Sequence, residues 1–293
     1  MTNKERNIEE TLSGDTKLGW FNCVTSWNRV LNAARRTIGK KATSKEPSNS
    51  WKAKILLAEH SPIRLLEFEW GWEKIRQWVS VHLVRHHEGV EKFVHSQRAD
   101  RRELPCDRDH LFQGAKNDMD MTANAQALIN ISRKRCCFCA SKETRDAWNM
   151  VLDELEKKDP ILRSKCVREC VYRGFCPEWM SKCNYWKSDS FKRDRASYVN
   201  TDFDNEEIKF ATIKGIAINI SNTGKCYDAE TKEELDYVSK FENGHSVIYV
   251  RDIPVCEFVV QAFTEYNAVE EKNIKHLDNN EWNNNIKNLE VIF

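Results

Sequence analysis

Cationic side chains end two apolar stretches of this 293-residue chain. The first stretch, residues 78–87, closes on Arg85-His86-His87 and is followed by Ser96-Gln97-Arg98. The second, residues 124–135, ends on Arg135. A forked guanidinium group matches two oxygens of a phosphate or carboxylate at once, and a rigid element holds it in place. Two such sets predict a large anionic ligand, most simply a nucleotide.

Apolar spacing predicts the elements that must position these residues. Helices are expected over 22–37, 51–60, 72–84 and, as one or two helices, 121–155; a strand is expected over 64–70, ended by Gly71. On a continuous helix Asn124, Leu128, Ile131 and Arg135 share one face. From spacing alone, that face is either a ligand surface or a solvated face with an internal ion pair.

Composition limits the partners. Charged residues make up 31% of the chain and the net charge is +1, so no bulk attraction to nucleic acid or membrane is expected. The opening residues are polar, and no apolar run is long enough to span a bilayer. In such a chain the eleven cysteines are expected to stay reduced. We therefore expect a cytoplasmic protein of a bacterium or of a phage-infected host cell.

A change in residue character divides the chain. Residues 187–207 are almost wholly polar, which is typical of a linker. Beyond them, turn sequences such as Asn222-Thr223-Gly224 and Asn243-Gly244 predict β-hairpins. The predicted organisation is a first domain over 1–195, a linker over 196–207 and a small β-rich domain over 208–293.

Five sequence blocks, in this order, resemble the flavin-dependent thymidylate synthases. They are Ala33-Ala34-Arg35-Arg36-Thr37, His60-Ser61-Pro62, Arg85-His86-His87 with Ser96-Gln97-Arg98, Arg101-Arg102-Glu103-Leu104-Pro105, and Asn124 through Arg135 with Glu143. The resemblance covers about residues 20 to 185. It implies an α/β (α+β) fold of the thymidylate synthase-complementing type, with an antiparallel sheet and long helices. It also implies a homotetramer with FAD at the subunit junctions.

The chemistry that this resemblance implies is reductive methylation of dUMP or a related pyrimidine nucleotide. Methylenetetrahydrofolate would give the one-carbon unit, and NADPH would reduce the flavin. Carried over by position, the nucleotide-binding residues are Arg85, Ser96, Arg98, Arg101 and Arg135, with Arg135 and Ser96 as the catalytic candidates. The flavin-binding candidates are His86, His87, Asn124, Gln126 and Asn130. The chain departs from the family pattern where His87 and Gln126 replace arginines and Cys139 replaces a histidine.

Closely spaced cysteines form a candidate metal site. Cys166, Cys170, Cys176 and Cys183 are separated by three, five and six residues. Zinc takes four thiolate or imidazole ligands, so a structural zinc clamp is one interpretation. Buried thiols that pack as small apolar side chains are the other.

The C-terminal residues resemble the HNH homing endonucleases in a truncated form. The matching segments are 218–227, 255–263, 274–280 and 284–290. His276 matches the histidine that acts as general base beside a divalent metal. Cys256-Glu257 and Lys275 depart from that pattern, since they replace a His-Arg pair and an acidic residue.

Three functions follow from these patterns. The first is a divergent flavin-dependent thymidylate synthase-like enzyme. The second is a non-catalytic, DNA-binding oligomeric scaffold that contacts DNA through residues 208–293, and the third is an HNH nuclease. The combination of the two resemblances suggests a phage origin.

Overall fold

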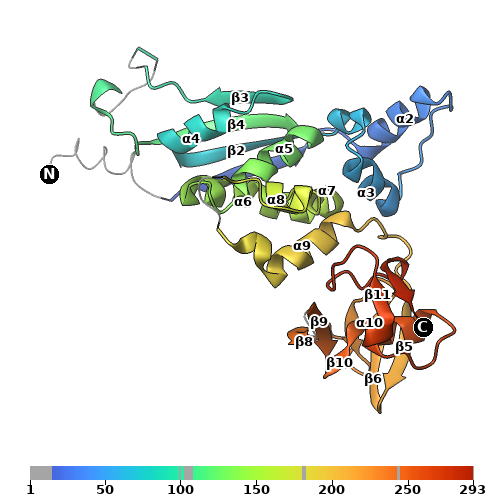
Figure 1. Ribbon diagram of the computed structural model, residues 1–293. Coiled ribbons are helices and arrows are strands. Elements are labelled where there is room, and N and C mark those ends of the chain that lie inside the picture. Colours follow the sequence, from blue (N-terminus) through green and yellow to red (C-terminus); the bar gives the residue numbers. More distant parts are fainter. Residues whose placement is uncertain (1–14, 99, 102–107, 180–182, 243–244, 293) are drawn as a thin grey trace. The chain divides into compact units, whose positions relative to one another are not determined.

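The chain folds as two units, Met1–Cys183 and Asn184–Phe293 (Figure 1). The computed structural model describes residues 15–98, 100–101, 108–179, 183–242 and 245–292. The first unit contains, in order, β1 (Lys17–Cys23), α2 (Trp27–Thr37), α3 (Asn49–Leu57), η1 (Ser61–Leu65), β2 (Glu67–Arg76), α4 (Gln77–Val84), β3 (Val90–Val94), η2 (Arg108–His110), β4 (Lys116–Asn124), α5 (Ala125–Arg135), α6 (Lys142–Lys158), α7 (Pro160–Arg163) and α8 (Glu169–Arg173).

An antiparallel sheet in the order β1-β2-β4-β3 forms the frame of this unit. Alternate residues of β2, namely Phe68, Trp70 and Trp72, are buried on the face that α5 and α6 cover (Figure 1). The Trp70 ring lies 5.9 Å from the Trp148 ring, and Trp72 Nε1 donates a hydrogen bond to the Ala147 carbonyl at 3.0 Å. These large aromatic contacts fix α6 on the sheet.

The prediction that Gly71 ends a strand is wrong. β2 continues through Gly71 to Arg76, and only Gln77–Val84 of the predicted helix 72–84 is helical. Gly71 is needed for a close approach, because a Cβ atom there would lie 2.4 Å from Trp20 Nε1 and 2.5 Å from Asp120 Oδ1. A glycine inside a strand can mark a place where neighbouring side chains approach the backbone closely, rather than the end of the strand.

Three further strands, β1, β3 and β4, were absent from the predicted elements. β1 occupies the start of the predicted helix 22–37, so α2 begins at Trp27. β4 occupies Lys116–Asn124, so α5 begins at Ala125 rather than near Met121. The remainder of the predicted 121–155 region does form two consecutive helices, α5 and α6.

The second unit is built from small sheets around one helix. Its elements are η3 (Tyr185–Lys187), α9 (Asp189–Val199), β5 (Ile208–Ile213), β6 (Ile216–Ser221), β7 (Cys226–Asp228), β8 (Val238–Glu242), β9 (His245–Val250), β10 (Ile253–Pro254), α10 (Val255–Phe263), η4 (Glu271–Asn273), β11 (Ile274–His276), η5 (Ile286–Asn288) and β12 (Leu289–Val291). The sheets have the orders β5-β6-β7, β10-β9-β8 and β11-β12. Phe258 and Val259 of α10 lie in the core with Ile218 and Ile220 of β6.

The hairpins predicted after residue 208 are present. β6 and β7 flank the turn at Gly224, whose φ of +89° favours glycine. β8 and β9 pair with Glu242 opposite His245, while Asn243-Gly244 between them lies outside the described residues.

The polar segment 187–207 is not wholly a linker. α9 occupies Asp189–Val199, capped by the Ser188 side chain, and belongs to the second unit, which begins at Asn184 rather than after residue 195. None of the described helices has both the length and the apolar character that a membrane-spanning segment needs.

Candidate functional site

Three cations meet at the C-terminal end of α4. Arg85 is the residue that ends the helix. Arg135, the last residue of α5, donates from Nε to His86 Nε2 at 3.0 Å and from Nη2 to the His82 carbonyl. Lys92 of β3 donates to the His86 carbonyl at 2.6 Å. The last carbonyls of a helix lack partners within it, so Arg135 and Lys92 satisfy this end of α4. The structure thus brings together the two blocks that the sequence singled out.

The positive charge at this point is not neutralised by protein carboxylates. Within the described residues, Arg85, Arg135 and Lys92 have no ion-pair partner. Burial, followed by the charge of Arg85, lowers the pKa of Arg135. Cations do suit a helix C-terminus, where the helix dipole is negative, but that effect is equivalent to only about half a charge. The cluster therefore keeps an excess of positive charge.

His86 is held as a neutral acceptor inside this cluster. Burial, followed by the charges of Arg135 and Lys92, lowers its pKa to about 4. Because Arg135 Nε donates to His86 Nε2, the proton of the neutral ring belongs on Nδ1. His87 is exposed, and its Nδ1 lies 3.4 Å from Lys92 Nζ.

His82 links the end of α4 to α6. Its Nδ1 lies 3.0 Å from Thr144 Oγ1, and its ring contacts the Trp78 ring edge-on at 5.4 Å. Its pKa is lowered by burial and then by the charges of Arg135 and Arg85. The lowered pKa favours the neutral ring, so His82 adds no further positive charge to the cluster.

Asn124 has a structural role at the start of α5. Its Oδ1 accepts the Ala127 N–H at 2.9 Å, which caps the helix. Its own N–H donates to the Gly89 carbonyl at 3.0 Å. Gly89 has a φ of +68°, and a Cβ there would meet Asn124 Nδ2 at 2.4 Å. The loop that follows Arg85 therefore contacts Asn124, the residue that caps the start of α5.

Gln126 and Asn130 belong to a separate polar network. Gln126 Nε2 donates to Glu59 Oε2 at 2.6 Å, and Arg133 pairs with the other oxygen of Glu59. Asn130 Oδ1 accepts from Gln126 at 3.3 Å and from Arg133 at 3.2 Å. The Arg133 guanidinium stacks 3.5 Å above the Tyr172 ring. Sequence reasoning missed Glu59 and Arg133, although helical spacing places Arg133 on the face of Gln126 and Asn130.

A pocket of about 500 Å³ joins the two earliest motif blocks. Thr37 and Ile38 at the end of α2, Trp51 and Ile55 of α3, and the turn His60-Ser61-Pro62 line it. The pocket wall therefore combines an indole and aliphatic side chains with the polar turn beside Glu59. Such a wall suits part of a planar ring system.

Within the described residues, no hydrogen bond or ion pair joins Ser96, Arg98 or Arg101 to Arg85, Arg135 or Lys92. These three residues follow β3, which ends at Val94. Arg98 is exposed and pairs with Asp100 through bonds of 2.9 and 2.6 Å. Arg101 is exposed, and residues 102–105 of its motif lie outside the described residues.

The predicted zinc ligands Cys166 and Cys170 lie beside different cysteines. Cys166 is fully buried beside Cys136, and burial raises its pKa to about 12. Cys170 instead lies near Cys137 and Cys176. The structure thus does not place Cys166 with the other predicted zinc ligands. Across the described residues, no three histidine, cysteine or acidic side chains are arranged to hold a metal ion.

His276 is the candidate metal-site residue of the second unit. His276 Nε2 lies 3.0 Å from Asn284 Oδ1, while Lys275 is exposed. Cys256 is buried in α10 and burial raises its pKa. No described carboxylate or second histidine joins His276 in a metal-binding group.

Comparison with known proteins points in one direction. No protein-family model matches the chain. A flavin-dependent thymidylate synthase of Clostridium tetani is 36% identical over 78 residues, which are 26% of this chain. The chain spans 31% of the length of that curated relative. This chain is similar to flavin-dependent thymidylate synthases.

Solved structures give a distant likeness to the same proteins. One is a UMP/dUMP methylase from Streptomyces cacaoi, bound with 5-Br dUMP, with a TM-score of 0.44 and 13% sequence identity. The match covers 55% of this chain and 95% of the methylase chain. The flavin-dependent thymidylate synthase of Helicobacter pylori, complexed with FAD and dUMP, also has a TM-score of 0.44, with 15% identity over 53% of this chain and 100% of its own.

Proposed function

We propose that this protein binds a pyrimidine nucleoside monophosphate at Arg85, Arg135 and Lys92, as a divergent flavin-dependent thymidylate synthase-like enzyme. The observation that carries the proposal is the excess of positive charge at the end of α4. Three cations without a carboxylate partner are costly to hold close together unless an anion joins them. A phosphate with two negative charges, or a uracil carbonyl that gains charge during reaction, is such a group.

The proposed roles follow from the contacts of each side chain. Arg85 is exposed and has no internal acceptor within the described residues, so its whole guanidinium fork is available for phosphate. Arg135 is held by His86 and the His82 carbonyl, so its position is fixed before a ligand arrives. Neutral His86 keeps its Nε2 as an acceptor and adds no further positive charge. Ser96 and Arg98 make no hydrogen bond or ion pair with this cluster within the described residues, and we propose that they complete the site from a second copy of the chain.

The pocket beside His60 fits part of a flavin. Its indole and aliphatic wall suits a planar ring, and Lys54 at its edge suits a phosphate. Thr37, Trp51 and the 60–62 turn would hold the group. Gln126 would act through Glu59, to which it donates, and Asn130 would act through Gln126. When bound, FAD reduced by NADPH would supply the hydride that completes methylation, with methylenetetrahydrofolate as the carbon donor.

Calorimetric titration of the full chain with dUMP, with and without added FAD, tests the nucleotide site. Arg85→Gln and Arg135→Gln should each weaken binding roughly tenfold or more, since a hydrogen bond to a charged group contributes about 1.5–3 kcal/mol. Arg29→Gln, an exposed arginine of α2, is the matched control and should leave binding unchanged. Deoxyuridine, which lacks the phosphate, should bind far more weakly. Equal affinity for dUMP in all four proteins would refute the site.

The flavin has a separate readout. Added FAD should acquire a shifted visible absorption band on binding, and Trp51→Ala should reduce that binding. Retained dUMP binding without any FAD binding would favour the alternative of a nucleotide-binding scaffold.

A further inference from the structure

A second pocket lies in the C-terminal unit, and none of its lining residues belongs to the proposed nucleotide site of the first unit. It has a volume of about 420 Å³, which is within the range of small-ligand sites. α9, the turn at Gly224 and the segment 282–285 enclose it. Lys192 of α9 pairs with Glu281 at 2.9 Å, and Asn280 Nδ2 donates to the Lys192 carbonyl at 2.8 Å. These bonds hold the walls together without a ligand.

Two aromatic rings and the exposed Arg193 guanidinium are among the groups that line this pocket. The Trp282 and Tyr237 rings are 6.5 Å apart at an angle of 63°. The Arg193 guanidinium lies 4.7 Å from the centre of the Trp282 ring. Indole, phenol and guanidinium surfaces are the groups on which a nucleobase stacks. The pocket interior therefore favours a flat aromatic ligand.

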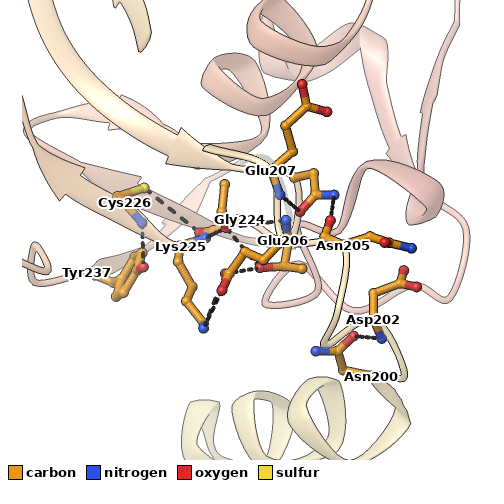
Figure 2. A network of polar contacts seen from close by, with 12 residues as sticks. Asn200, Asp202, Asn205, Glu206, Glu207, Gly224, Lys225, Cys226 and Tyr237 are labelled. Carbon is orange, nitrogen blue, oxygen red and sulfur yellow. Dashed lines mark hydrogen bonds and ion pairs between the residues drawn. The ribbon is translucent and has the colours of Figure 1, made fainter. Parts of the chain in front are cut away.

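The charges around the pocket suit a ligand with a single phosphate. Arg193 has no carboxylate partner in the described part of the chain. Lys225 is already paired with Glu206 at 3.2 Å, and Figure 2 shows this pair beside the turn at Gly224. The lining carboxylates of Asp194 and Glu234 would repel a second phosphate. One cation without a carboxylate partner matches one phosphate group.

Hydroxyl groups can supply the remaining recognition. Tyr237 Oη accepts the Cys226 N–H at 2.9 Å (Figure 2) and is also within hydrogen-bonding reach of the Cys226 thiol. Burial raises the pKa of Tyr237, which keeps the hydroxyl protonated. Ser197 of α9 also lines the pocket, and its hydroxyl can donate a hydrogen bond. A nucleobase edge carries the acceptors that such donors require.

We propose that this pocket binds a nucleoside monophosphate, stacked on Trp282 with its phosphate on Arg193. The same chemistry is offered by a free mononucleotide and by an unpaired nucleotide of a single DNA strand. This site is independent of the proposed nucleotide site in the first unit, because the two share no residue.

The test uses the full chain carrying Arg85→Gln and Arg135→Gln, so that the first-unit cluster cannot account for binding. Probes are dAMP, dTMP, the matching nucleosides and a short single-stranded oligodeoxythymidine. Binding is followed by calorimetry and by the NMR signal of the Trp282 indole N–H, which is buried without a hydrogen-bond partner in the described residues. We expect a nucleotide to bind and to shift that signal.

Arg193→Gln should weaken nucleotide binding at least tenfold and Trp282→Leu should abolish the indole signal and the binding, whereas Arg195→Gln on the same helix should change neither. Binding of the mononucleotide, or of the oligonucleotide alone, identifies the source of the ligand and supports the proposal. No binding by any probe, equal binding of nucleosides and nucleotides, or full affinity in Arg193→Gln would overturn it.

Discussion

The neutral state of His86 makes the stability of the first unit depend on pH. The pKa of His86 is lowered from 6.5 to about 4, first by burial and then by Arg135 and Lys92. Between these values the unfolded chain binds a proton that the folded chain does not. Stability from this group is therefore complete above pH 6.5 and is lost as the pH falls toward 4.

The size of the effect follows from the two pKa values. For a full shift, lowering the pH from about 7 to about 5 would cost about 2 kcal/mol of unfolding free energy. His86 is only partly buried, so solvent screening reduces this to roughly 1 kcal/mol. Replacement by glutamine keeps an oxygen that can accept the Arg135 Nε hydrogen but cannot titrate. His86→Gln should therefore lose less stability between the two pH values than the parent chain.

Urea unfolding at about pH 7 and about pH 5 measures this difference. Tryptophan fluorescence reports mainly on the first unit, because only Trp186 and Trp282 of the ten tryptophans lie in the second. Groups such as Asp159 contribute equally to both proteins and cancel in the comparison. An identical pH dependence for the parent and His86→Gln would refute the argument that Arg135 and Lys92 surround a neutral histidine.

Three other predictions concern single contacts. Lys92→Met should remove the donor to the His86 carbonyl, lowering the unfolding free energy by about 1 kcal/mol and weakening dUMP binding several-fold; unchanged calorimetric affinity would argue against a ligand role. Gly71→Ala should lower the unfolding free energy by about 1–3 kcal/mol, because the added Cβ meets an indole and a carboxylate, and an unchanged urea midpoint would contradict the close approach. Cys226 and Cys256, whose thiol pKa values burial raises, should react with a disulfide reagent at about pH 8 only as fast as the protein unfolds; immediate reaction would show that they are accessible.

The juxtaposition of the two cationic blocks was predictable, whereas the contacts within it were not. Residue types and spacing singled out Arg85, His86 and Arg135, and these do meet. Lys92 was missed because a single lysine in a strand has no distinctive pattern. Arg98 instead pairs with Asp100, a contact that the family resemblance did not indicate.

The errors in the fold have the same origin. Gly71 was interpreted from local conformational preference, but its place is decided by Trp20 and Asp120 from neighbouring strands. β4 was hidden because Asp118 and Asp120 alternate with its buried residues, and acids are uncommon in strands. The turn residues of the second unit were informative, since a turn with positive φ restricts the residue type locally.

The attachment of α9 to the second unit changes what can be exchanged as a piece. A fragment cut at residue 208, where the strands begin, would lack Lys192 and Arg193. It would therefore lose the ion pair with Glu281 and one wall of the pocket. A cut before Asn184, where the second unit begins, carries the whole assembly. Transplantation of this module into another protein should therefore include the polar helix, even though its sequence looks dispensable.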